Sequence, residues 1–227
     1  MTTWRTGDFT ASLWEDAAEI LTRIHQLDFL TELAEGTLSP EIFVEYIQQD
    51  SFYLVDYAKA LAMLSARAPH PRAGQFWAGA ASGAVAAEQE LHAELIGDQR
   101  LADLPRPETL SATTRGYMHT LTTACAYDPY EVGAAAVLPC FWIYAEVGIR
   151  LAARARQVAD HPFGRWMAEY GDPEFIEAAQ QAIDLVDEAA SGASGQVREQ
   201  MREAFLDASR YEELFWSAAY AREVWTR

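Results

Sequence analysis

The chain has 227 residues, half of them hydrophobic, and carries 34 acidic against 17 basic side chains, for a net charge of −17. This length suffices for one well-cored domain and is short for two, and the composition is that of a globular chain rather than a disordered one. An acidic surface repels phosphate backbones and anionic lipid, which argues against nucleic acid or a membrane as partner.

The first ten residues lack a basic stretch followed by an apolar run, so we expect no signal peptide. The longest apolar run, Val132 to Ala145, is too short to span a bilayer and is interrupted by Pro139. The two cysteines, Cys125 and Cys140, are too few for a disulfide framework. These features predict a cytoplasmic protein whose thiols are reduced.

Apolar residues recur with helical periodicity, and no segment alternates long enough to indicate a strand. A first helix is predicted over residues 11–33, ended by Gly36, and Ser39-Pro40-Glu41 begins a second that reaches Ala68. Further helices are predicted over residues 72–96, 108–126, 128–158 with a kink near Pro139, 172–190 and 197–225. The expected fold class is all-α, a single helical bundle over residues 1–227.

The second predicted helix carries an acid among tyrosines. Tyr46, Asp50, Tyr53 and Tyr57 are spaced to share one face. A buried carboxylate without partners is costly, so one interpretation is a closed network in which the tyrosines hydrogen-bond to Asp50. The other is a pocket in which Asp50 and aromatic walls hold a flat heterocycle with ring nitrogens and an exocyclic amine.

The fifth predicted helix carries Cys140 directly after Pro139, with Tyr144 one turn later on the same face. If the proline breaks the helix, Cys140 lies near a new helix N-terminus, which would favour its thiolate. The alternative is an ordinary buried cysteine.

In the last helix, Glu212 shares a face with Phe205 and Phe215, whereas Glu213 shares one with Arg210 and Ser217. Glu212 is therefore predicted to point inward and Glu213 toward solvent. A carboxyl in an apolar setting has a raised pKa and can donate a proton near neutrality. A different helix phase would leave both at the surface.

Other motifs are weaker. Glu88, Glu90 and His92 offer metal-ligand chemistry, but the paired Glu-x-x-His elements of di-iron bundles do not occur, and a lone His25 is typically structural. The sequence has no glycine-rich phosphate loop and no nucleophile elbow. We therefore predict no metal and no cofactor.

Taken together, these segments resemble the TenA (thiaminase II) family, in order and over residues 29–220. The resemblance rests on four segments: Phe29-Leu30 through Gly36-Thr37-Leu38 to Phe43, Tyr46, Gln49-Asp50 and Tyr53-Leu54; Leu138 through Gly148; Trp166-Met167 with Tyr170 and Glu174-Phe175; and Tyr211-Glu212 with Phe215-Trp216. Phe141 and Phe163 depart from it, because tyrosine is frequent at these places in the family.

The resemblance implies a haem-oxygenase-like bundle without haem, assembled as a homotetramer. It implies a cysteine-dependent aminopyrimidine aminohydrolase of thiamin salvage that can also cleave thiamin. The family's nucleophile corresponds to Cys140 and its catalytic glutamate to Glu212. Its substrate-binding residues correspond to Asp50, Tyr53, Tyr117, Tyr144 and Tyr170.

On this hypothesis the Cys140 thiolate adds to the electron-poor pyrimidine, the methylene substituent leaves, water replaces it and the cysteine departs. Glu212 protonates the ring nitrogen or the leaving group, and Asp50 orients the ring. Two alternatives remain: a cofactor-free or di-iron oxidase on the same fold, and a non-catalytic binder of a small heterocycle.

Overall fold

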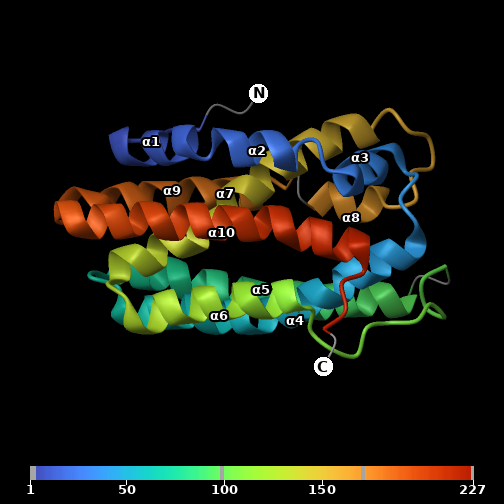
Figure 1. Ribbon diagram of the computed structural model, residues 1–227, viewed down its shortest axis with the longest axis horizontal. Coiled ribbons are helices and arrows are strands. Elements are labelled where there is room, and N and C mark those ends of the chain that lie inside the picture. Colours follow the sequence, from blue (N-terminus) through green and yellow to red (C-terminus); the bar gives the residue numbers. More distant parts are fainter. Residues whose placement is uncertain (1–3, 98–99, 170–171, 226–227) are drawn as a thin grey trace.

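In the computed structural model, which describes residues 4–97, 100–169 and 172–225, the chain is all-α, as predicted. The helices follow one another in the order α1 Asp8–Asp16, α2 Ala18–Ile24, α3 Asp28–Glu35, α4 Pro40–Arg67, α5 Pro71–Gly97, α6 Ala112–Tyr127, α7 Tyr130–Ala155, α8 Gly164–Glu169, α9 Pro173–Gly192 and α10 Gly195–Ala221. Figure 1 shows α1 to α3 along one edge, α4 to α6 along the opposite edge, and α7, α9 and α10 between them.

The single helix predicted over residues 11–33 is wrong, because the structure divides this segment into α1, α2 and α3. The first break is slight, since the Ala17 and Leu21 amides still donate to carbonyls four residues earlier. The second is a real change of direction, because Leu27 is extended with ψ 132°. The apolar stripe continues across both breaks, so periodicity did not reveal them.

The predicted stop at Gly36 is confirmed. Gly36 has φ 72°, a left-handed conformation that glycine adopts without a steric penalty. The amide of Thr37 donates to the Glu32 carbonyl at 2.9 Å and that of Gly36 to the Leu33 carbonyl at 3.2 Å, which caps the end of α3. A methyl group on Gly36 would lie 3.0 Å from Pro162 Cδ.

One helix end and one short helix in the C-terminal half also differ from prediction. The last helix ends at Ala221 rather than near residue 225, where Arg222 takes the left-handed conformation at φ 51°. Because Arg222 is not a glycine, the sequence gives no stop signal there. The short helix α8 lies in a segment for which no helix was predicted.

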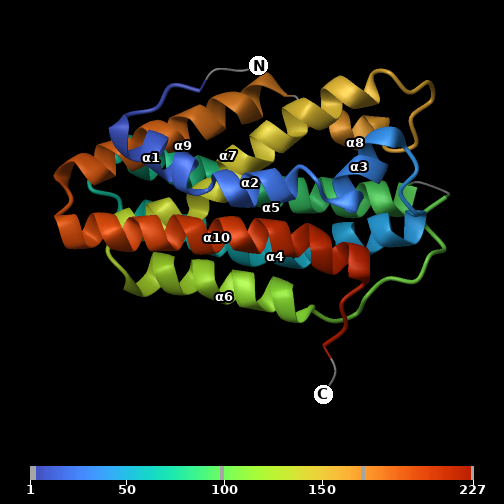
Figure 2. The same ribbon diagram turned by 45° about the horizontal axis from the view of Figure 1, so that its top comes forward.

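Helix α7 runs through the middle of the bundle (Figure 2) and packs extensively against α9 and α10. It is long and apolar enough to cross a membrane, but 78% of its most apolar window is buried inside the bundle. The hydrophobic core of the bundle therefore explains its composition.

Polar contacts fix the helices that surround α7. The Gln49 side chain donates to the Thr109 carbonyl and accepts from the Ser111 amide, which ties the start of α6 to α4. The Asp187 carboxylate on α9 accepts from the Gly7 amide at 2.6 Å and from the Thr10 hydroxyl at 2.6 Å. The N-terminal segment is thereby held against the outer face of α9.

Candidate active site

A cavity of about 720 Å³ lies among α4, α5, α6, α7, α9 and α10. Volumes of this size hold drug-sized ligands. The cavity is lined by Asp50, Tyr53, Leu54, Tyr57, Gln75, Phe76, Gly79, Ala80, Gly83, Ala84, Ala87, Tyr117, Cys140, Phe141, Tyr144, Glu174, Phe175, Glu177, Ala178, Gln181, Glu212 and Phe215. Six of the seven predicted site residues are among them. The seventh, Tyr170, lies outside the described residues.

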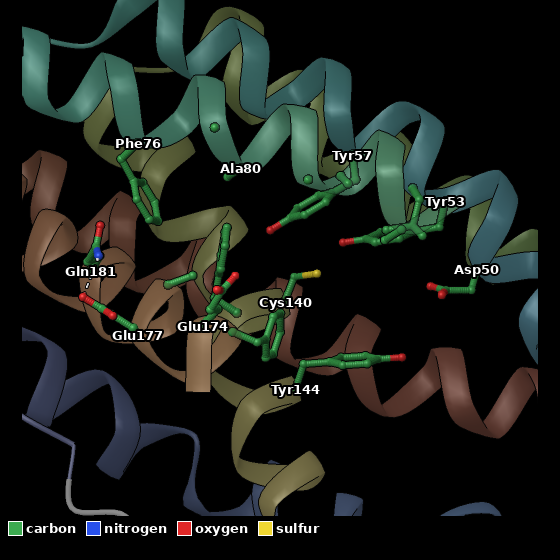
Figure 3. A pocket seen from close by; sticks show the side chains of 18 of the residues that line it. Asp50, Tyr53, Tyr57, Phe76, Ala80, Cys140, Tyr144, Glu174, Glu177 and Gln181 are labelled. Atoms are coloured by element: carbon green, nitrogen blue, oxygen red, sulfur yellow. Dashed lines mark hydrogen bonds between the residues drawn. The ribbon is translucent and has the colours of Figure 1, made fainter. Parts of the chain in front are cut away.

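Cys140 lies near the middle of this cavity, between Asp50 and Tyr53 on one side and Phe76 and Gln181 on the other (Figure 3). It does not lie at a helix end, because α7 continues through Pro139 from residue 130 to 155. The helix is therefore not broken at Pro139, and no new helix N-terminus is present to favour the thiolate.

The surroundings instead hold Cys140 in the thiol form. Burial raises the pKa of Cys140 well above its ordinary value of 9.0, and the nearby Glu212 raises it further. The nearby hydroxyls of Tyr53 and Tyr57 lower the pKa of this thiol, but burial is the larger effect. A nucleophilic reaction of this sulfur would require prior transfer of its proton to a neighbouring group.

Asp50 is a buried carboxyl with no hydrogen-bond partner among the residues that the structure describes. Its side chain is 7% exposed, and it makes no side-chain hydrogen bond to any residue in the described part of the chain. The closed tyrosine network is therefore not present around Asp50. Burial raises the pKa of Asp50 from 3.8 to about 7. A buried acid with free lone pairs is suited to pair with a polar ligand.

Glu212 points inward, and the predicted phase of the last helix is confirmed. Its side chain is 3% exposed and accepts a 2.6 Å hydrogen bond from the Tyr117 hydroxyl. Burial raises the pKa of Glu212 from 4.5 to about 8, and the charge of Asp50 contributes in the same direction. Glu213 instead turns toward the surface and pairs with Arg23 through two contacts of 2.8 Å.

Aromatic rings form the walls beside these groups. Tyr53 stacks between Tyr57 and Tyr117, with centroid distances of 5.3 and 5.1 Å. Tyr144 stacks on Trp216 at 5.3 Å. Burial raises the pKa of Tyr53, Tyr57 and Tyr117 well above 10, so their hydroxyls remain protonated. Parallel faces of this kind accept a flat ring.

The predicted site omitted several parts of the lining, among them Tyr57 and the residues that α5 and α9 contribute. Tyr57 follows Asp50 and Tyr53 on the same helical stripe, so the spacing already placed it there. The contribution of α5 had no such signal, because it consists largely of small residues: Gly79, Ala80, Gly83, Ala84 and Ala87. Because these side chains are small or absent, they leave the open space that forms this side of the cavity.

The lining is acidic. Asp50, Glu174, Glu177 and Glu212 contribute carboxyl groups, and no lysine or arginine appears among the described residues around the cavity. Such a site favours neutral or positively charged ligands over phosphate esters. Within the described ranges, no three His, Cys, Asp or Glu side chains are grouped to hold a metal ion, and the side chains of Glu88, Glu90 and His92 lie outside them.

Comparison of the fold with solved structures identifies the structural class of the protein. The chain superimposes on a domain with a heme oxygenase-like fold from Shewanella denitrificans, with a TM-score of 0.71 at 12% identity, covering 95% of this chain and 93% of that one. It superimposes better on a TenA homologue from P. horikoshii, with a TM-score of 0.82 at 25% identity, covering 94% and 98%. Residues 14–222 match the model of the TENA/THI-4/PQQC family, and the chain belongs to that family.

Relatives with named activities extend this result. An aminopyrimidine aminohydrolase from Bacillus subtilis is 34% identical, covering 87% of this chain and 84% of the relative. One from Halalkalibacterium halodurans is 30% identical, covering 96% and 97%. A thiamine biosynthesis multifunctional protein from Corynebacterium glutamicum is 36% identical over 97% of this chain, which spans only 28% of that protein's length.

Proposed function

We propose that this protein is an aminopyrimidine aminohydrolase of the thiaminase II type, acting in thiamin salvage. It hydrolyses the bond between the pyrimidine methylene carbon and its nitrogen substituent, converting an aminomethylpyrimidine to the hydroxymethylpyrimidine, with thiamin as a second substrate. One observation carries the proposal: a thiol, Cys140, and two buried carboxyls, Asp50 and Glu212, line the same aromatic cavity. The aminohydrolases of B. subtilis and H. halodurans support it.

Asp50 orients the pyrimidine. Its carboxyl is buried and has no hydrogen-bond partner in the described part of the protein, so it is available to a ring nitrogen and the adjacent exocyclic amine. Pairing with a base-like ring favours the ionised form of Asp50, which offsets part of the burial that raises its pKa. Tyr53 and Tyr144 then hold the ring faces.

Glu212 links the two proton transfers that the addition requires. With a pKa of about 8, it is mostly protonated at neutral pH and can give its proton to a ring nitrogen. The resulting carboxylate then accepts the proton of the Cys140 thiol as sulfur bonds to the ring carbon. The ring gains one proton and one sulfur bond, and Glu212 returns to its protonated state.

Loss of the substituent and hydration complete the cycle. The ring electrons expel the amine, which leaves as ammonia from its protonated form and takes the C–N bonding pair. Water then adds to the exposed methylene carbon and loses a proton. The cysteine sulfur departs with its bonding pair and takes up a proton, and the ring nitrogen gives up the proton that it had gained. Covalent catalysis of this kind replaces one difficult displacement by easier steps. Tyr117 holds Glu212 through its 2.6 Å hydrogen bond during these transfers.

The proposal includes the cytoplasm as location and a homotetramer as assembly. The acidic composition and the burial of α7 inside the bundle support the first. The second follows from the family resemblance and is tested by sedimentation of the purified protein.

The decisive experiment incubates the protein with 4-amino-5-aminomethyl-2-methylpyrimidine and with thiamin in parallel, following products by mass. We expect the hydroxymethylpyrimidine, with one ammonia released per molecule of the first substrate. A binder without catalysis would retain the substrate and release no ammonia. An oxidase would require stoichiometric iron or consume oxygen, which metal analysis and an oxygen electrode detect.

A further inference from the structure

The solvent-exposed part of the cavity lining comes from two helices. Among the described lining residues, the exposed ones are Gln75, Gly79 and Gly83 of α5 and Glu174, Glu177 and Gln181 of α9. Those from α4, α6, α7 and α10 are buried or half-buried. Figure 3 shows side chains of these two helices on either side of the space that leads to Cys140. We call the gap between the two exposed rows the mouth of the cavity.

A second hollow, of about 350 Å³, continues this gap. It shares three residues with the cavity and is lined by Arg72, Gln75, Phe76, Gln181, Asp184 and Leu185, again from α5 and α9. The backbones of α5 and α9 make little contact with each other in the described part of the chain, whereas α9 packs on α7 and α1. Side chains therefore decide how wide the gap between α5 and α9 is.

The side chain of Glu188 on α9 crosses this gap. One carboxylate oxygen lies 2.8 Å from Nε2 of His70, directly before α5, and the other lies 2.6 Å from the guanidinium of Arg72. We call these three side chains the clasp. Their side chains are 46% exposed for Glu188, 31% for His70 and 72% for Arg72. Ion pairs with this exposure are weak, so the clasp can open and re-form.

Another flank of α9 is fastened by more contacts. Asp187 accepts hydrogen bonds from the amides of Gly7 and Thr10 and from the Thr10 hydroxyl. The Gln180 side chain pairs with both backbone groups of Arg5, at 2.9 and 2.8 Å. A methyl group on Gly7 would lie 2.7 Å from Cγ of Asp187, so the N-terminal segment lies directly against the helix. Movement of α9 is therefore expected on the side that faces α5.

From these contacts we propose that small ligands enter and leave the cavity between α5 and α9, and that the clasp limits how often the mouth is wide enough to admit them. Opening separates Glu188 from His70 and Arg72 and leaves the N-terminal segment attached to α9. Access of this kind does not depend on which reaction the cavity supports.

Access is measured with iodoacetamide, a small uncharged reagent, as the rate at which it alkylates Cys140, followed by peptide mass. When opening is fast compared with alkylation, this rate follows the population of the open form. For Glu188→Ala and for Arg72→Ala we expect a rise of about two- to fivefold, the size typical of a lost exposed ion pair. The double variant should be no faster than Glu188→Ala, because both changes remove the same interaction.

The two single variants change the charge in opposite directions. If they acted only through charge near the thiol, Glu188→Ala would speed alkylation and Arg72→Ala would slow it. Opposite effects, or no effect of either variant, would overturn the clasp. Glu35→Ala is the matched control and should leave the rate unchanged, because it removes an exposed pair with Arg154 between α3 and α7.

The location of the mouth is tested by Gln75→Trp, which places a large ring on its rim. We expect alkylation of Cys140 to slow by at least about tenfold, since the open form becomes rarer. Ala78→Trp is the control, because Ala78 is exposed on the same helix and lines neither hollow. Equal rates for these two variants would mean that ligands enter elsewhere.

A buried thiol outside the cavity reports on folding in each variant. Cys125 is fully buried and does not line the cavity, so its alkylation should stay slow throughout. Should Gln75→Trp expose Cys125, Gln181→Trp narrows the same mouth from α9, and the same slowing at Cys140 is expected. An unchanged rate in a folded Gln181→Trp variant would equally overturn this route of entry.

Discussion

The hydroxyl of Tyr117 on α6 donates a 2.6 Å hydrogen bond to Oε1 of Glu212 on α10, joining two residues 95 positions apart. This contact fixes one oxygen of a buried acid and leaves the other available to a ligand. It also opposes the effect of burial, since a hydrogen bond to the carboxylate lowers the pKa of Glu212. The protonation of the proposed catalytic acid therefore depends on Tyr117.

Tyr117→Phe should shift the pH dependence of turnover. Without the hydroxyl, the pKa of Glu212 rises above about 8, so the acid stays protonated to higher pH. We expect the basic limb of kcat/KM for the aminomethylpyrimidine to move upward by up to about one pH unit, with a lower plateau because Glu212 is less well held. If kcat/KM falls at every pH while the basic limb stays at the same pH, the pKa of Glu212 does not depend on Tyr117.

Glu212→Gln should lower turnover far more than Glu213→Gln, although the two residues are adjacent. Glu212 lies in the cavity, whereas Glu213 pairs with Arg23 at the surface. General acid catalysis contributes about 10²- to 10⁴-fold, and we expect a loss in that range for Glu212→Gln and less than about threefold for Glu213→Gln. Initial rates of ammonia release measure both, and similar losses would remove Glu212 from the mechanism.

The sequence anticipated those parts of the site that follow one helical stripe. Asp50 and Tyr53 on α4, and Glu212 on α10, were placed by spacing alone, because a long amphipathic helix fixes which side chains face the core. The convergence of these stripes came from the family resemblance. Spacing within one helix does not report which helices become neighbours.

Other features depended on tertiary context. The apolar stripe of the first helices continues across the breaks that separate α1, α2 and α3, so the sequence pattern does not reveal them. The environment of Cys140 depends on Glu212, 72 positions away in the sequence, and on neighbours from α4. The sequence left open whether Pro139 breaks α7 beside Cys140, and in the structure the helix continues through it. The α5 wall of the cavity was missed because its glycines and alanines contribute space, which a search for chemically active side chains does not detect.

Cys140→Ser should abolish turnover while preserving binding. Serine keeps the shape of the side chain, but its hydroxyl is a far weaker nucleophile toward an electron-poor ring. We expect loss of product by at least about 10³-fold, with a dissociation constant for the aminomethylpyrimidine within about threefold of the KM-derived value. Calorimetry and product mass measure the two effects. Retention of most activity would exclude covalent catalysis by Cys140, and Cys125→Ser provides the control for a buried thiol outside the cavity.

Glu212→Gln should also make the protein more stable at alkaline pH. The pKa of Glu212 is 4.5 ordinarily and about 8 in the folded protein, so between these values the folded state holds a proton that the unfolded state releases. Stability therefore falls as pH rises from about 4.5 to about 8, and glutamine, which does not ionise, removes this loss. Because one pKa unit corresponds to about 1.4 kcal/mol, the gain in unfolding free energy should grow by a few kcal/mol between pH 5 and 8. Urea titrations of wild type, Glu212→Gln and Glu213→Gln across this range measure it. Parallel curves for wild type and Glu212→Gln would mean that Glu212 titrates near its ordinary pKa, and that the cavity does not hold it as an acid at neutral pH.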